Sequence, residues 1–186
     1  NCHLGLIYGK KGESEKAREY IRKGIDKVEK SLGDEHPELG LELLYLGNEL
    51  VSENSFDKAI PVFERSATIL ENSLGVKNHH LSLAYRGLAR AQLNIDQEQN
   101  AEVFYRKALQ IQRAIYGEES AKLIDLLSEF RSLKRTMGDE QEVSRIDAKI
   151  NELKESLADQ VLDDRLDIDE EEVNTKKNRK GRSLVK

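Results

Sequence analysis

The chain repeats itself at a spacing of 42 residues, and this periodicity constrains its fold more than any other feature of the sequence. A large side chain followed by glycine recurs at that interval, at Leu32-Gly33, Leu74-Gly75 and Tyr116-Gly117. Three further columns hold alanine, a large apolar residue and a small residue: Ala17, Ala59, Ala101; Leu4, Leu46, Leu88, Phe130; and Gly5, Gly47, Ala89. Independent columns do not align in this way by chance, so the chain is an array of equivalent units.

Each unit has the pattern of two helices joined by a turn. A fourth column holds the residue types that most easily adopt the left-handed backbone conformation ending a helix: Gly12, Asn54, Asp96 and Gly138. Apolar residues follow helical spacing before this column, as at Leu39, Leu43, Leu46 and Leu50. Helical spacing resumes after it. His36-Pro37 precedes one such run, and proline favours the first helical turn, so a helix is predicted to begin there.

The pattern of small and large residues resembles the tetratricopeptide repeat. A bulky residue stands four positions after each alanine of the second helix, at Ile21, Phe63 and Tyr105. Residues 32–37 (LGDEHP) and 6–12 (LIYGKKG) are similar to the longer repeats of the kinesin light chain family. The resemblance covers roughly residues 1–155. It implies an all-α, right-handed superhelix, or α-solenoid, of about four helical hairpins that binds other polypeptides.

The repeat register divides the chain into units at about 1–36, 37–78, 79–120 and 121–162. Because the first unit is incomplete and the chain starts without methionine at Asn1, we expect further residues upstream. The fourth unit has Val143 and Asp147 where the earlier ones have alanine and a bulky residue. Terminal repeats commonly diverge because their outer face meets water.

Apolar residues continue at helical spacing beyond the fourth turn, at Ile146, Ile150, Leu153, Leu157 and Val161. This favours a long helix that caps the stack, with a coiled-coil or partner-docking helix as the alternative. Residues 163–186 form an acidic and then basic tail, which is predicted to be disordered. Its basic run, Lys176 to Arg182, is interpreted as a solvated tail, with a nuclear-import or nucleic-acid patch as the alternative.

Composition excludes several classes of protein. A net charge of -5 argues against a body that neutralises a phosphate backbone, so nucleic acid is not an expected partner. Cys2 is the only cysteine, which excludes an intrachain disulfide and a cysteine-rich zinc site. No apolar run approaches the roughly 20 residues that a membrane span needs. We expect a soluble, intracellular, cytoplasmic protein, with an organelle left open by the incomplete N-terminus.

Motifs for chemistry are missing from the sequence. The glycines at 5, 9 and 12 lie in helical sequence without the Lys-Ser/Thr of a phosphate loop. His79-His80 would point about 100° apart on a helix, so the pair fits a linker or a helix start better than a metal site. We therefore predict a protein without catalytic activity, cofactor, metal or small-molecule substrate.

The expected ligand is a protein segment held on the concave side, which the first helix of each hairpin lines. The candidate groove residues are Leu44, Asn48, Val51, Arg86, Arg90, Leu93 and Arg135, with Leu6, Leu41 and Leu83 beside them. Asn48 could hold a peptide backbone, and Arg86 and Arg90, one turn apart, could bind a carboxylate. That predicts an acidic or leucine-acidic peptide, unless the arginines are solvated or paired with Glu49 or Glu129.

Three functional hypotheses remain at this point. The first is a noncatalytic adaptor or scaffold that binds a partner in the groove. The second is a structural subunit or assembly factor that docks through the convex face and the last helix. RNA binding is third, and the acidic charge disfavours it. Kinesin light chains carry paired asparagines where this chain has Leu44-Tyr45 and Arg86-Gly87, and their heavy-chain-binding heptads are absent from these residues, so neither cargo specificity nor a motor role carries over.

Overall fold

The computed structural model describes residues 2–159 of the chain, and within them it consists of helices without any strand. The elements are α1 (Cys2–Lys10), α2 (Ser14–Leu32), α3 (Pro37–Ser52), α4 (Phe56–Leu74), α5 (His79–Leu93), α6 (Glu98–Tyr116), the 3-10 turn η1 (Ala121–Leu123), α7 (Ile124–Thr136) and a last helix over residues 140–159. The prediction of an all-α fold is confirmed. The predicted tail, residues 163–186, lies outside the described residues.

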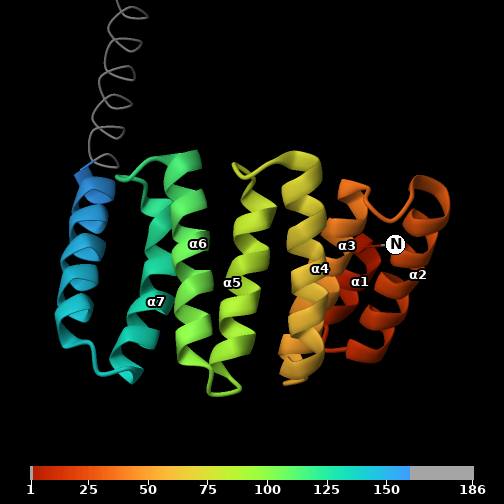
Figure 1. Ribbon diagram of the computed structural model, residues 1–186, viewed down its shortest axis with the longest axis horizontal. Coiled ribbons are helices and arrows are strands. Elements are labelled where there is room, and N and C mark those ends of the chain that lie inside the picture. The colour runs from red at the N-terminus through yellow and green to blue at the C-terminus, as the bar shows by residue number, and fades with distance from the viewer. Residues whose placement is uncertain (1, 160–186) are drawn as a thin grey trace, which may run out of the picture.

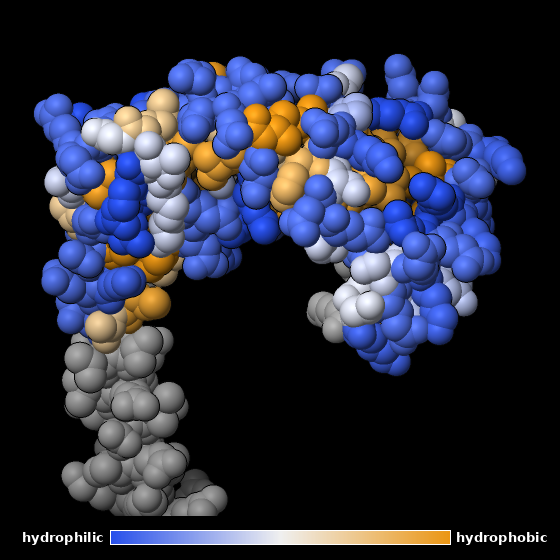
Figure 2. All heavy atoms as spheres, turned by 90° about the horizontal axis from the view of Figure 1, so that it is seen from below, coloured by the Kyte–Doolittle hydropathy of each residue, from blue (hydrophilic) through white to orange (hydrophobic). Residues whose placement is uncertain are grey.

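The helices form antiparallel hairpins that stand side by side (Figure 1). The first helices contact one another, α1 with α3 and α3 with α5, whereas each second helix contacts its own partner and the next first helix. Because the first helices of neighbouring hairpins lie nearer to one another than the second helices do, the stack curves with the first helices on its inner side. Figure 2 shows the resulting arch from the ends of the helices. This arrangement is the superhelix that the repeats predicted.

The turns inside the hairpins adopt the predicted backbone conformation. Gly12 and Gly138 have φ of 76° and 75°, and Asn54 and Asp96 have φ of 57° and 58°. After glycine, asparagine and aspartate are the residues that tolerate this left-handed region best, which explains why they share this column with glycine.

Each link between hairpins ends in an N-terminal helix cap, and this cap recurs every 42 residues. His36 Nδ1 accepts a hydrogen bond from the backbone N–H of Glu38 at 3.2 Å, and Asn78 Oδ1 accepts one from that of His80 at 2.7 Å. Ser120 caps η1 in the same way. Each cap satisfies a backbone donor that the helix leaves unpaired. The expected helix starts at Pro37 and at the histidine pair are confirmed.

Large side chains of the second helices fill spaces left by glycine on the first helices. Phe63 of α4 is fully buried between Gly47 of α3 and Gly87 of α5. A Cβ added at either glycine would lie 2.6 Å or 2.4 Å from the Phe63 ring. The three column alanines, Ala17, Ala59 and Ala101, have no exposed surface. The pairing of small with large residues therefore joins each hairpin both internally and to its neighbour.

The last helix covers the end of the stack. Its apolar residues Ile146, Ile150 and Leu153 are buried, whereas Leu157 is 43% exposed and Val161 lies outside the described residues. The remaining side chains between 140 and 159 are mostly polar and face outward. A buried apolar stripe under a polar outer surface is what a capping helix requires.

Candidate functional site

The concave side of the arch presents one narrow stripe from each first helix. On α5, nine residues are buried against neighbouring helices, and the stripe that stays accessible consists of Leu83, Arg86, Arg90 and Leu93. Their spacing of three, four and three residues places them on one helix face. The inner edge of the arch in Figure 2 carries mainly hydrophilic and intermediate side chains.

In one column of the repeat, every residue whose side chain is described is exposed. It holds Asn48 on α3, Arg90 on α5 and Ser132 on α7, each separated from the next by 42 residues. The side chain of Leu6, which begins this column on α1, is not described. All three groups can form hydrogen bonds, and Arg90 adds a positive charge. Asn48 and Arg90 are predicted groove residues, whereas Ser132 was missed, although counting 42 residues from Arg90 identifies it.

Two further columns flank this row. One holds the partly exposed Val51 and Leu93 and the exposed Arg135, and the other holds Leu41, Leu83 and Asp125. In both columns the α3 and α5 members are aliphatic and the α7 member is charged. The surface therefore changes along the stack, from apolar beside Asn48 and Arg90 to charged beside Ser132.

The prediction for Leu44 was wrong, because its side chain is only 1% exposed and belongs to the core. The partly exposed residue at this level of α3 is its neighbour, Tyr45. Leu44 and Arg86 occupy the same repeat position, and this column packs between adjacent hairpins. The error arose because helical spacing alone does not distinguish a face that meets the next hairpin from one that meets solvent.

Arg86 is engaged within the stack. Its Nε donates to Glu129 Oε2 at 3.0 Å and its Nη2 donates to Glu129 Oε1 at 2.5 Å, so the carboxylate of α7 is held bidentately. The hydroxyl of Tyr105 donates to Glu129 Oε2 at 3.4 Å. Hydrogen bonding to Glu129 raises the pKa of Arg86, and burial raises the pKa of Tyr105, with the Glu129 charge adding to the effect. Arg86 therefore joins two hairpins, and the predicted Arg86–Arg90 carboxylate clamp does not form.

Arg90 is available instead. Its side chain is exposed, and within residues 2–159 it makes no hydrogen bond or ion pair. Asn48 and Arg135 are also exposed, and their side chains too make none with the described part of the chain. Of the predicted groove residues, Asn48, Val51, Arg90, Leu93 and Arg135 are thus accessible on the first helices.

The described residues contain neither a candidate metal site nor a candidate membrane-spanning helix. Among residues 2–159, no group of histidine, cysteine, aspartate and glutamate side chains is arranged to hold a metal ion. No helix in that range is long and apolar enough to cross a membrane. Two cavities, of about 530 Å³ and 410 Å³, lie on either side of α6 and share Gln110 and Ala114 in their lining.

Comparison with known proteins agrees with this architecture. The family model described as Tetratricopeptide repeat matches residues 1–26 and 82–115. The crystal structure of BtubC (BKLC) from P. vanneervenii superposes with a TM-score of 0.78 at 14% sequence identity, and the match covers 84% of this chain and 63% of that one. Our chain therefore spans less than two thirds of that protein's length. No curated protein matches the sequence.

A second solved structure contains repeats of the same kind. It is described as a kinesin light chain from Podosopora anserina with nearly identical TPR-like repeats, and it superposes with a TM-score of 0.71 at 20% identity. The match covers 80% of our chain and 70% of the other. Two segments of the chain thus match the tetratricopeptide repeat model, and its stack of hairpins has the fold of these kinesin-light-chain-like repeat structures.

Proposed function

We propose that the protein is a noncatalytic adaptor or scaffold that binds a segment of a partner polypeptide on its concave surface. Tetratricopeptide repeats are protein–protein interaction modules, which supports the general assignment. The observation that carries the specific proposal is the exposed row of Asn48, Arg90 and Ser132 across three successive hairpins. Hydrogen-bonding side chains at a regular spacing fit a ligand that is itself a regular chain of peptide groups.

The chemistry of the row indicates the kind of segment. The amide of Asn48 can donate to and accept from a peptide backbone. The hydroxyl of Ser132 donates to the backbone carbonyl of Ser128 at 3.0 Å, so it offers the ligand an acceptor. Arg90 can form a charge-assisted, bidentate hydrogen bond with a carboxylate. Val51 and Leu93, beside this row, offer apolar contacts. We therefore infer a leucine-acidic segment whose carboxylate meets Arg90, while Arg86 stays bound to Glu129 and contributes no ligand contact.

Direct titration tests this proposal. A fluorescein-labelled 12-residue peptide of alternating leucine and glutamate serves as the probe, and its leucine–lysine counterpart controls for nonspecific adsorption. Fluorescence anisotropy should show binding of the acidic peptide to the native chain, and Arg90→Glu should weaken it at least tenfold, about 1.4 kcal/mol. Arg145→Glu is the matched control, because Arg145 is exposed on the last helix, away from the first helices. Equal loss from both variants, or equal binding of both peptides, would refute the groove assignment.

The cavities beside α6 are the observation that favours the second candidate, a structural subunit or assembly factor docked through the convex face and last helix. The described part of the last helix supports it less, because Ile150 and Leu153 are buried and only Leu157 is a large exposed apolar residue there. A peptide-independent complex that survives Arg90→Glu and is lost on replacing Leu157 with lysine would establish this candidate.

We further propose an intracellular, cytoplasmic location. The sequence has a single cysteine, Cys2, and so can form no intrachain disulfide, which is typical of proteins of a reducing compartment. Fluorescence microscopy of the tagged full-length protein tests this assignment, and accumulation in the secretory pathway would contradict it.

A further inference from the structure

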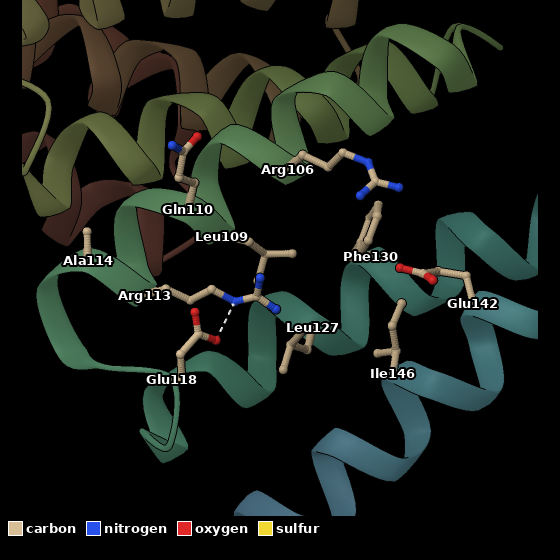
Figure 3. Close-up of a pocket in the computed structure, with 10 residues that line it drawn as sticks. All are labelled: Arg106, Leu109, Gln110, Arg113, Ala114, Glu118, Leu127, Phe130, Glu142 and Ile146. Atoms are coloured by element: carbon tan, nitrogen blue, oxygen red, sulfur yellow. Dashed lines mark ion pairs between the residues drawn. The ribbon is translucent and has the colours of Figure 1, made fainter.

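A cavity lies on the opposite side of the molecule from the concave row, between α6 and the last helix. The cavity there has a volume of about 530 Å³. Figure 3 shows Leu109 of α6, Leu127 and Phe130 of α7 and Ile146 of the last helix around its interior. These four side chains are at most 5% exposed, so they form an apolar floor rather than a protruding patch.

The α6 wall of this cavity is basic. Arg106 and Arg113 border it, with 57% and 41% of their side chains exposed. The Arg106 guanidinium lies 5.4 Å from the centre of the Phe130 ring, which places the charge directly beside the apolar floor. The exposed outward stripe of α6 is Val103, Arg106, Lys107, Gln110, Arg113 and Ala114, and it contains no acidic residue.

The arginines of this wall already pair with acidic groups at the surface. Arg106 donates to Glu102 of its own helix, from Nη2 at 2.8 Å and from Nε at 3.0 Å, and 57% of its side chain stays exposed. Arg113 contacts Glu118 at 3.1 Å, and both side chains are substantially exposed. Such surface ion pairs contribute about 0–1 kcal/mol, so another carboxylate can replace Glu118 at little cost. Glu142, on the opposite wall, contacts Arg145 of its own helix at 3.4 Å. The groove therefore suits a segment that combines carboxylates with a few apolar side chains.

We propose that residues 163–172 of this same chain occupy the groove, with their carboxylates against Arg106 and Arg113. This segment, DDRLDIDEEE, contains seven acidic residues and one arginine. Leu166 and Ile168 lie between the acidic residues and supply the apolar contacts for the floor. The proposal is independent of the concave-surface function, because it uses none of the same residues: α7 contributes Leu127 and Phe130 here, and Ser132 and Arg135 to the concave side.

The position of the last helix makes the contact short-range. Lys149 pairs with Glu119 at 2.9 Å, so the middle of the last helix lies beside the loop that follows α6. Residue 159, the last described, and the carboxyl end of α6 lie at the same end of the stack (Figure 1). Arg113 stands in the last turn of α6, at this same end. Asp163 follows residue 159 by four residues, and an extended chain covers about 3.3–3.6 Å per residue, so the acidic run starts a short length of chain from this end of the stack.

Paramagnetic relaxation in the full-length chain tests this contact. Glu171→Cys in a Cys2→Ser background provides one attachment point for a nitroxide, and the amide signals of the ¹⁵N-labelled protein report its surroundings. Amides of residues 106–114 and 142–146 should lose most of their intensity, while those of α2 and α3 keep theirs. Arg106→Glu with Arg113→Glu should restore the signals. Arg22→Glu with Lys23→Glu, an equal charge change on the exposed face of α2, should not.

Three results would overturn the proposal. Broadening centred on Arg90 would place the segment on the concave face. The absence of local broadening would indicate that the acidic run stays in solvent or pairs with the basic run at 176–182. In a mixture, one copy of the protein carries the nitroxide without ¹⁵N, and the other carries ¹⁵N without the nitroxide. Broadening of the same amides in this mixture would show that the contact is intermolecular.

Discussion

Arg131 donates a hydrogen bond to Asp147 at 2.5 Å, at the two positions where the earlier hairpins pack a small residue against a large apolar one. The same columns hold Gly47 with Phe63 and Ala89 with Tyr105. An ion pair thus replaces an apolar contact at the fourth hairpin, where the side chains of Arg131 and Asp147 are 30% and 40% exposed. A polar pair suits this half-exposed position, since no further hairpin covers it within residues 2–159.

Restoring the apolar pair should stabilise the fourth hairpin. We expect Arg131→Ala with Asp147→Tyr, which copies Ala89 and Tyr105, to raise the free energy of unfolding by about 1 kcal/mol, because the buried ring area outweighs a half-exposed ion pair. Asp147→Tyr alone should destabilise, since Arg131 would occupy the space of the ring. Urea denaturation followed by circular dichroism measures both changes, and a double variant less stable than the native chain would contradict this reading.

The contact of Phe63 with Gly87 makes a second prediction. Gly87→Ala should lower the free energy of unfolding by about 1–2 kcal/mol, because overpacking at 2.4 Å exceeds what alanine gains in helix propensity. Phe63→Leu added to Gly87→Ala should recover part of the loss, since the smaller side chain leaves room for the methyl group. Thermal unfolding distinguishes the variants, with Lys58→Ala on the exposed face of α4 as the control. Equal stability of Gly87→Ala and Lys58→Ala would show that the contact of Phe63 with Gly87 leaves room for a methyl group.

The bidentate pair between Arg86 and Glu129 should be structural. Glu129→Ala leaves a half-buried guanidinium without its carboxylate and should cost about 2 kcal/mol. Arg86→Leu introduces the side chain that Leu44 provides at the preceding junction, so the double variant Arg86→Leu, Glu129→Ala should recover most of that loss. Urea unfolding of the two single variants and the double variant gives the coupling energy. Additive effects would mean that the two residues act independently.

Acid should weaken the attachment of α7 to α6 through Glu102. Burial acts to raise the pKa of Glu102, but hydrogen bonds from Lys134 and Arg106, together with their charges, hold it below the ordinary value of 4.5. A carboxyl group with a lowered pKa stabilises the fold above its unfolded-state pKa and loses that contribution as pH falls through the folded-state value. Stability of the native chain should therefore fall below about pH 4.5, and Glu102→Gln should flatten that part of the curve. Parallel curves for the two proteins between pH 6 and pH 3 would exclude this role.

Much of the fold follows directly from the 42-residue columns. The left-handed turns at Asn54 and Asp96 and the helix start at Pro37 are residue-type effects, so they are visible without coordinates. The repeat also identifies Ser132 once Arg90 is assigned, because both stand in the same column.

The candidate site was less predictable, for a physical reason. Leu44 and Arg86 lie in a column that meets the next hairpin, and the curvature that decides this depends on how closely neighbouring first helices approach. The sequence left Glu49 and Glu129 as possible partners of the arginines, and only the packing of the hairpins selects Glu129, 43 residues from Arg86. The groove beside α6 brings together three helices, so no local pattern indicates its apolar floor.

Site-specific photo-crosslinking tests the central claim most directly. Asn48, on the concave row, is replaced by benzoylphenylalanine in one protein, and Gln110, on the outward face of α6, in another. After exposure to cell lysate and light, the crosslinked partners are identified by mass spectrometry. The account predicts a set of partners captured through position 48 that disappears when Arg90→Glu is added and is not captured through position 110. Partners captured only through position 110, or retained at position 48 despite Arg90→Glu, would contradict binding by the concave row.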